Sequence, residues 1–209
     1  MSLIVFEGID GTGKTTCADK LLVYLVSKGL DCAKFSEPSH SKYGMKIRNA
    51  MNGEKRLSVE RETELFVKDR KVDVKENIKP ALKEGKIVLL DRYYFSTAAY
   101  QGSRMTTIEW QAANLIITRN EQFSPIPDLV LFFFADIDSC IERIAKGRDI
   151  KTYMERKDNL IRVNDIFKLI HAEMHGKYNS FAINANQDIE TVFNDVKDIT
   201  DTFLATRIS

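Results

Sequence analysis

A glycine-rich run near the start of the sequence has the residue types and spacing that bind phosphate. Residues 8–15 read GIDGTGKT and match G-x-x-x-x-G-K-[ST]. Its glycines let backbone N–H groups converge on phosphate oxygens, while Lys14 reaches the β- and γ-phosphates and the Thr15 hydroxyl binds Mg²⁺. The run therefore predicts a site for ATP and Mg²⁺, formed by Gly8, Ile9, Asp10, Gly11, Thr12, Gly13, Lys14, Thr15 and Thr16.

A second polar run follows a later apolar stretch. Asp91-Arg92-Tyr93 comes directly after residues 87–90, and open α/β sheets bind ligands at the carboxyl ends of their strands. Asp91 can hold Mg²⁺ through water or accept a hydrogen bond from Thr15. Arg92 can hold a phosphate with two parallel hydrogen bonds. An isolated Asp-Arg pair is more often a surface salt bridge, so the residue types alone leave both interpretations open.

Short apolar runs that alternate with longer helical patterns would position these groups. Runs that stay apolar predict strands buried on both faces of a parallel sheet, at residues 3–6, 32–35, 87–90, 129–134 and 181–184. Helical patterns cover residues 15–28, 60–84, 107–120, 137–146, 157–175 and 189–204. The alternation predicts a doubly wound α/β fold with right-handed crossovers. No repeat or linker divides the chain, so we expect a single domain over residues 1–209.

Composition excludes several classes of protein. The 209 residues include 31 lysines and arginines and 30 aspartates and glutamates, a net charge of +1 that argues against nucleic-acid binding by bulk charge. The three cysteines are widely spread and contain no C-x-x-C pair, so we expect neither a disulfide framework nor a structural zinc site. Without a signal-peptide pattern or a long apolar run, we expect a cytoplasmic protein with no membrane partner. The small size and the lack of an Asn-Lys-x-Asp guanine motif favour a small-molecule kinase over a GTPase.

The two polar runs together resemble a known family. FEGIDGTGKTT at residues 6–16 and DRYYFSTAAYQG at residues 91–102 look like thymidylate kinase, which phosphorylates dTMP with ATP. Residues 66–70 are similar to the family's F-x-x-D-R helix, and residues 36–38 resemble its R-E-P turn. The resemblance covers nearly the whole chain. It implies a P-loop nucleoside monophosphate kinase fold with a central five-stranded parallel sheet flanked by helices, a small lid at about residues 146–157, and a homodimer.

The resemblance also implies how dTMP would be bound. Phe66 would stack on the thymine ring, and Arg70, one turn later on the same helix face, would hydrogen-bond the base O4. Thr97 and Gln101 would lie near the base edge. Tyr100 would pack against the deoxyribose and crowd out a 2′-hydroxyl.

The groups that would assist phosphoryl transfer are implied in the same way. Arg92 would bind the dTMP phosphate, and Asp10 would lie near the sugar 3′-hydroxyl or the metal. Lys14, Arg92 and a further arginine would share the charge that develops on the moving group. Some family members carry a basic residue in the middle of the phosphate loop and others use the lid. This loop has Gly11-Thr12 there, so the lid residue Arg148 is the first candidate, with Arg143 a partner for adenine.

Departures from the family pattern leave alternatives open. Ser36 stands where the family usually has arginine, and Ser39-His40 replaces a usual Gly-Gly. One alternative is a kinase for another deoxypyrimidine monophosphate, such as dUMP. Another is a nucleotide-binding regulator without turnover. The leading hypothesis is a dTMP kinase, because Phe66 and Arg70 favour a pyrimidine with an O4 acceptor.

Overall fold

Five parallel strands form the centre of the structure, a computed structural model that describes residues 1–53, 57–105, 109–147 and 153–208. The order across the sheet is β2-β3-β1-β4-β5, and every pairing is parallel. The strands are β1 (Ser2–Gly8), β2 (Cys32–Ser36), β3 (Ile87–Asp91), β4 (Leu129–Phe134) and β5 (Ser180–Asn184). The predicted α/β fold with a five-stranded parallel sheet is confirmed.

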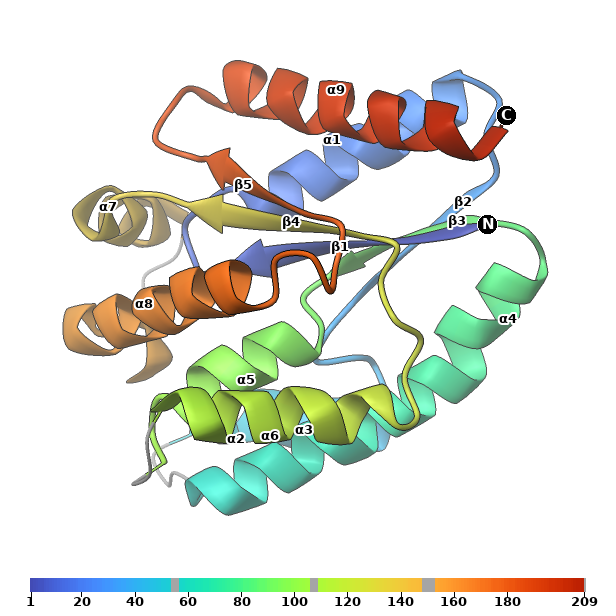
Figure 1. Ribbon diagram of the computed structural model, residues 1–209. Helices are drawn as coiled ribbons and strands as arrows, with labels where there is room; N and C mark the ends of the chain where they lie inside the picture. Colours follow the sequence, from blue (N-terminus) through green and yellow to red (C-terminus); the bar gives the residue numbers. More distant parts are fainter. Residues whose placement is uncertain (54–56, 106–108, 148–152, 209) are drawn as a thin grey trace.

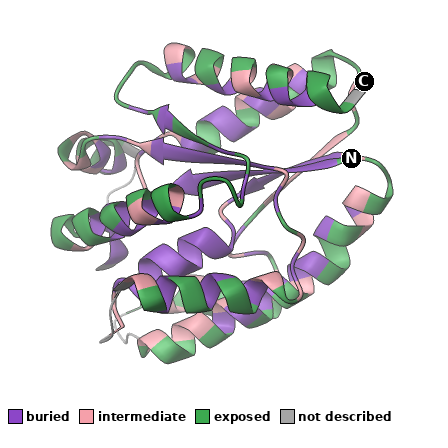
Figure 2. Cartoon of the chain, in the orientation of Figure 1, coloured by how far each residue is buried: buried purple, intermediate pink, exposed green. Residues whose placement is uncertain are grey.

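Burial explains why the strand runs lack alternation. Every residue of β1 and β3 is buried, and only the last residue of β4 is partly exposed. These three strands lie inside the sheet order, so helices cover both of their faces. The edge strand β2 is half-exposed, which matches its weaker apolar run. Figure 2 shows the buried residues concentrated on the sheet and on the helix sides that face it.

Helices form a layer on each side of the sheet (Figure 1). On one side, α1 (Lys14–Ser27) packs against α9 (Ile189–Ile208). On the other side, α5 (Tyr94–Gly102) packs against α6 (Glu109–Glu121) and α8 (Lys157–Glu173). The helix α7 (Ile137–Gly147) follows β4. Within the ranges given above, no helix is both long and apolar enough to cross a membrane.

The predicted helix over residues 60–84 is correct in extent but is not a single α-helix. It consists of α3 (Val59–Asp73), a π-helical turn (Val74–Ile78) and α4 (Lys79–Lys83). Pro80 has no N–H for the carbonyl four residues earlier, and its ring crowds that carbonyl. The widened turn contains that carbonyl, at Glu76, and ends two residues before Pro80.

Two further helices were absent from the sequence prediction. The helix α2 (Lys42–Asn52) begins after Ser41, whose side chain accepts hydrogen bonds from the N–H groups of Tyr43 at 3.0 Å and Gly44 at 3.3 Å. The helix α5 is buried along all nine of its residues, so its sequence has no apolar periodicity. Both helices contribute residues to the site described next.

Candidate active site

The phosphate loop, residues 8–15, connects β1 to α1 and has the conformation that the motif requires. Gly13 is the N-cap of α1 and has φ +84°, a left-handed value that favours glycine. The Thr12 hydroxyl donates to the Ile9 carbonyl at 2.9 Å, and Lys14 Nζ donates to the same carbonyl at 3.0 Å. Burial lowers the pKa of Lys14, and the nearby Arg92 acts in the same direction. The loop and the start of α1 thus bring backbone N–H groups and one buried amine together.

A close approach at Gly11 joins this loop to α7. Gly11 has φ +84°, and a Cβ at that position would lie 2.4 Å from the carbonyl oxygen of Cys140. Arg143, one turn later on α7, donates to the Gly11 carbonyl at 3.4 Å and to the Ala185 carbonyl at 2.9 Å. The predicted adenine partner Arg143 therefore lies at the loop, although its role toward adenine stays a prediction.

Oxygen ligands suited to Mg²⁺ meet where β3 ends. The Thr15 hydroxyl donates to Asp91 Oδ2 at 2.5 Å. Asp91 Oδ1 is buried and has no hydrogen-bond partner in the part of the chain that the structure describes. A carboxylate and a hydroxyl beside a phosphate loop are the donor set by which Mg²⁺ is held in such sites. The residues present therefore fit the metal that the motif predicts.

The Arg92 side chain contacts both the phosphate loop and the first turn of α5. Its Nη2 donates to Asp10 Oδ1 at 2.7 Å, and its Nη1 donates to the Gly8 carbonyl at 3.2 Å and to Ser96 Oγ at 3.1 Å. Burial alone would raise the pKa of Asp10, but the positive charges of Arg92 and Lys14 hold that pKa well below its usual value. The Arg92 backbone has φ +72°, which is strained for a side chain of this size and is typical of functional sites.

A cavity of about 310 Å³ opens beside Arg92. Its walls come from the Glu37-Pro38 turn, from α2, α3 and α5, and from the 3₁₀ turn Tyr153–Glu155. The predicted substrate residues that line it are Phe66, Arg92, Thr97, Tyr100 and Gln101. Asp10 lines it as well, and its Oδ2 accepts a hydrogen bond from the Tyr100 hydroxyl at 3.1 Å. A phosphate loop thus adjoins a pocket whose lining includes the Arg92 guanidinium and the rings of Phe66 and Tyr100.

Comparison with known sequences decides the family. Residues 6–196 match the family model for thymidylate kinase. The chain belongs to the thymidylate kinase family. A probable thymidylate kinase from Archaeoglobus fulgidus is 39% identical over 202 residues, which cover 97% of this chain and 96% of the relative. Thymidylate kinases from Akkermansia muciniphila and Desulfotalea psychrophila are 43% identical over 171 residues and 40% identical over 199 residues. These alignments cover 81% and 93% of this chain, and 79% and 91% of the relatives.

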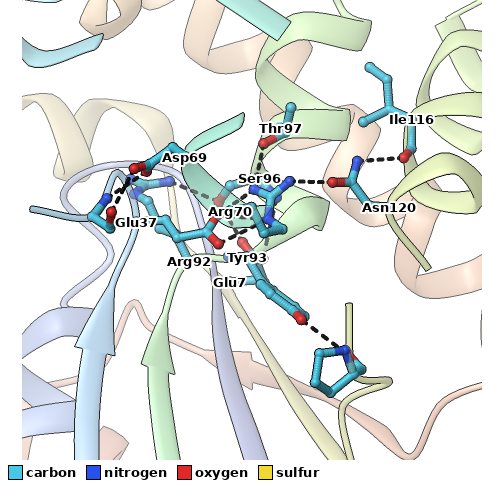
Figure 3. A network of polar contacts seen from close by, with 12 residues as sticks. Glu7, Glu37, Asp69, Arg70, Arg92, Tyr93, Ser96, Thr97, Ile116 and Asn120 are labelled. Atoms are coloured by element: carbon cyan, nitrogen blue, oxygen red, sulfur yellow. Dashed lines mark hydrogen bonds and ion pairs between the residues drawn. The ribbon is translucent and has the colours of Figure 1, made fainter. Parts of the chain in front are cut away.

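Not every site residue predicted from the thymidylate kinase resemblance borders the cavity. Arg70 is fully buried and is not among the cavity-lining residues. Its Nε donates to both oxygens of Glu37 at 2.9 Å, its Nη1 donates to Asn120 Oδ1 at 2.7 Å, and its Nη2 donates to Thr97 Oγ1 at 2.9 Å (Figure 3). The structure therefore places Arg70 behind two cavity-lining side chains, Glu37 and Thr97. Its direct contact with the base stays a prediction.

The predicted lid at residues 146–157 lies partly outside the described residues. Arg148, the first candidate for the additional cation, lies outside the described residues, and its role stays a prediction. The following turn brings Met154 and Glu155 to the cavity, where both are buried. Glu155, which lies within the expected lid at residues 146–157, therefore borders the pocket.

Several buried residues at this site had no predicted role there, among them Glu7, Glu37 and Asn120. Burial raises the pKa of Glu37, and the Arg70 guanidinium opposes that shift. Glu7 directly follows the apolar run of residues 3–6 and precedes the phosphate loop, a position that could have marked it as a polar residue at the site. Asn120 ends a helical pattern and has no comparable signal.

Replacing Glu37 with leucine is expected to lower the free energy of unfolding by about 3 kcal/mol, because it leaves buried Arg70 donors without acceptors. Urea unfolding followed by circular dichroism measures this. The matched control is Glu64→Leu, since Glu64 is exposed on α3 and forms surface ion pairs with Arg61 and Lys68. Its expected cost is less than about 1 kcal/mol. Equal losses in the two variants would contradict the structural role of the Glu37–Arg70 pair.

Proposed function

We propose that this chain transfers the γ-phosphoryl group of ATP to dTMP, giving ADP and dTDP. The observation that carries the proposal is the position of Arg92, which contacts the phosphate loop at Gly8 and Asp10 and also lines the adjacent cavity. A guanidinium at that junction can hold an acceptor phosphate beside the donor phosphates. Phosphoryl transfer depends mainly on such positioning and on neutralising charge.

On the donor side, the backbone N–H groups of the phosphate loop would bind the β- and γ-phosphates. The Lys14 amine, buried at the start of α1, would approach the γ-phosphoryl oxygens. Thr15 and Asp91 would hold Mg²⁺, which neutralises negative charge on the phosphate oxygens when bound. Arg92 would add positive charge from the acceptor side. Arg148 is proposed as a further cation from the lid.

On the acceptor side, the cavity has groups that match thymine. Gln101 Oε1 is buried without a hydrogen-bond partner among the described residues, and Gln101 Nε2 donates to Glu62 at 3.4 Å. A free amide oxygen can accept the N3–H of thymine or uracil, whereas N3 of cytosine carries no hydrogen. Phe66 would stack on the base, and the Tyr100 ring, which lies beside Asp10, would crowd out a 2′-hydroxyl.

A coupled ADP-release assay with dTMP, dUMP, dCMP, UMP and dGMP tests the proposal. We expect the highest kcat/KM for dTMP, about tenfold less for dUMP because one methyl contact is lost, and on the order of 10²-fold less for dCMP and UMP. Equal rates with dUMP would instead favour a kinase for another deoxypyrimidine. Nucleotide binding without any ADP release would favour a regulator.

We also propose that the chain forms a homodimer, as the family resemblance implies. Leu115 on α6 is a large apolar side chain that is 68% exposed, and Ile161 on α8 is 39% exposed. The two helices are neighbours on the same face of the sheet. Light scattering after size exclusion measures the mass directly, and a mass of one chain would refute the dimer.

A further inference from the structure

Glu7 is a fully buried carboxylate that has no part in the roles assigned so far. It is the penultimate residue of β1 and directly precedes Gly8 of the phosphate loop. It does not line the cavity, so it does not touch the space proposed for dTMP. Burying a carboxylate inside a parallel sheet costs free energy unless hydrogen-bond donors compensate for the water that it loses.

Both oxygens of Glu7 accept hydrogen bonds from the segment that follows β3 (Figure 3). Oε1 accepts from the Tyr93 N–H at 2.8 Å and from the Ser96 N–H at 3.3 Å, and Oε2 accepts from Ser96 Oγ at 2.5 Å. The N-cap residue of α5, Tyr93, makes no side-chain cap of its own. From the neighbouring strand, Glu7 therefore accepts from the N–H groups of the N-cap residue Tyr93 and of Ser96 in the first turn of α5.

Ser96 extends this contact to Arg92. Because the Ser96 hydroxyl donates its hydrogen to Glu7, its oxygen lone pairs remain available, and Arg92 Nη1 donates to that oxygen at 3.1 Å. The Arg92 backbone N–H also donates to the carbonyl of Phe6, the residue before Glu7, at 3.0 Å. The strained backbone at Arg92 is thus held between consecutive residues of β1 and the first turn of α5.

We propose that Glu7 is a positioning residue that orients the Arg92 guanidinium toward the acceptor phosphate by fixing the direction of the Ser96 hydroxyl. The inference rests on the proposed function, in which Arg92 binds the phosphate of dTMP. Glu7 adjoins the donor loop in sequence and contacts α5 in space. One side chain therefore keeps the acceptor arginine aligned with the strand that carries the phosphate loop.

The variant Glu7→Gln tests the proposal, because glutamine keeps the shape and one acceptor oxygen. That oxygen can still accept from the Tyr93 and Ser96 N–H groups. The amide nitrogen then faces Ser96 Oγ and donates to it. The Ser96 hydroxyl hydrogen must turn away from residue 7, toward the side from which Arg92 donates to the same oxygen. We expect the dissociation constant for dTMP, measured by calorimetry, to rise about tenfold. The inhibition constant of thymidine and the affinity for ATP should stay unchanged, because neither ligand places a 5′-monophosphate at Arg92.

Two further comparisons keep the test decisive. In a Ser96→Ala background, Glu7→Gln should change dTMP affinity by less than about threefold, because the residue through which it acts is gone. The matched control Asp128→Asn removes a carboxylate charge at the other end of β1, where Asp128 Oδ2 accepts from the Leu3 N–H at 2.8 Å, and should leave dTMP affinity unchanged.

Equal weakening of dTMP and thymidine, unchanged dTMP affinity, or fully multiplicative effects with Ser96→Ala would each overturn the positioning role. If Glu7→Gln does not fold, Ser96→Ala alone must weaken dTMP binding and spare thymidine, or the proposal fails. Absence of dTMP phosphorylation by the parent chain would overturn the proposed function instead. The two failures are therefore distinguishable.

Discussion

Replacing Lys14 with methionine is expected to lower kcat for phosphoryl transfer by about 10³-fold, because one preorganised charge at the γ-phosphoryl group is removed. The backbone N–H groups of the loop remain, so the KM for ATP should change much less than kcat. Methionine has a similar length and no charge to desolvate. Since burial already lowers the pKa of the Lys14 amine, the melting temperature should not fall.

Steady-state kinetics with ATP and dTMP, together with a thermal melt, measure these effects. Lys20→Met is the matched control, since Lys20 lies on the same helix and makes a surface ion pair with Glu190 at 2.8 Å. The control should retain the parent kcat within about twofold, because surface ion pairs contribute little. A Lys14→Met enzyme that keeps more than a tenth of the parent kcat would contradict the assigned role.

Replacing Arg92 with methionine is expected to lower kcat/KM for dTMP by about 10³-fold, equivalent to about 4 kcal/mol of transition-state stabilisation. The guanidinium that lines the cavity would be lost, and Asp10 would lose its ion-pair partner. Both changes place net negative charge where the acceptor phosphate must bind. The KM for ATP should change by less than about threefold, because the Lys14 amine and the loop N–H groups remain.

Initial rates at varied dTMP and saturating ATP measure the effect. Arg61→Met provides the control, because Arg61 is exposed on α3 and pairs only with Glu64 among the described side chains. It should leave both KM values unchanged. A dTMP KM and kcat within about fivefold of the parent values in Arg92→Met would rule out Arg92 as the phosphate anchor.

The sequence predicted the sheet well, because its three inner strands are buried on both faces and read as apolar runs. It did not predict α2 or α5. The helix α5 is enclosed on all sides, so no polar face marks its period. The helix α2 is mostly polar, and its clearest signal is the N-cap Ser41. The π-helical turn before Pro80 follows from a backbone conflict that hydrophobic periodicity does not report.

The prediction of the site was most complete where a short motif fixes the backbone. It was less complete where contacts between distant segments determine the position of a side chain. The phosphate loop and the Thr15–Asp91 contact follow from short motifs at strand ends. Arg70 was expected at the base, but its donors are engaged by Glu37, Thr97 and Asn120. These partners come from separate segments that meet only after folding, so their spacing in the sequence does not predict the hydrogen-bond network.

The contact between Gly11 and Cys140 restricts how this kinase can stabilise its transition state. Any side chain at position 11 would collide with the carbonyl of Cys140, because the backbones of the loop and α7 are in close contact there. An arginine introduced there would require α7 to shift away from the loop. The loop therefore offers backbone N–H groups and Lys14 to the polyphosphate, and further positive charge must come from residues outside its middle, as proposed for Arg148.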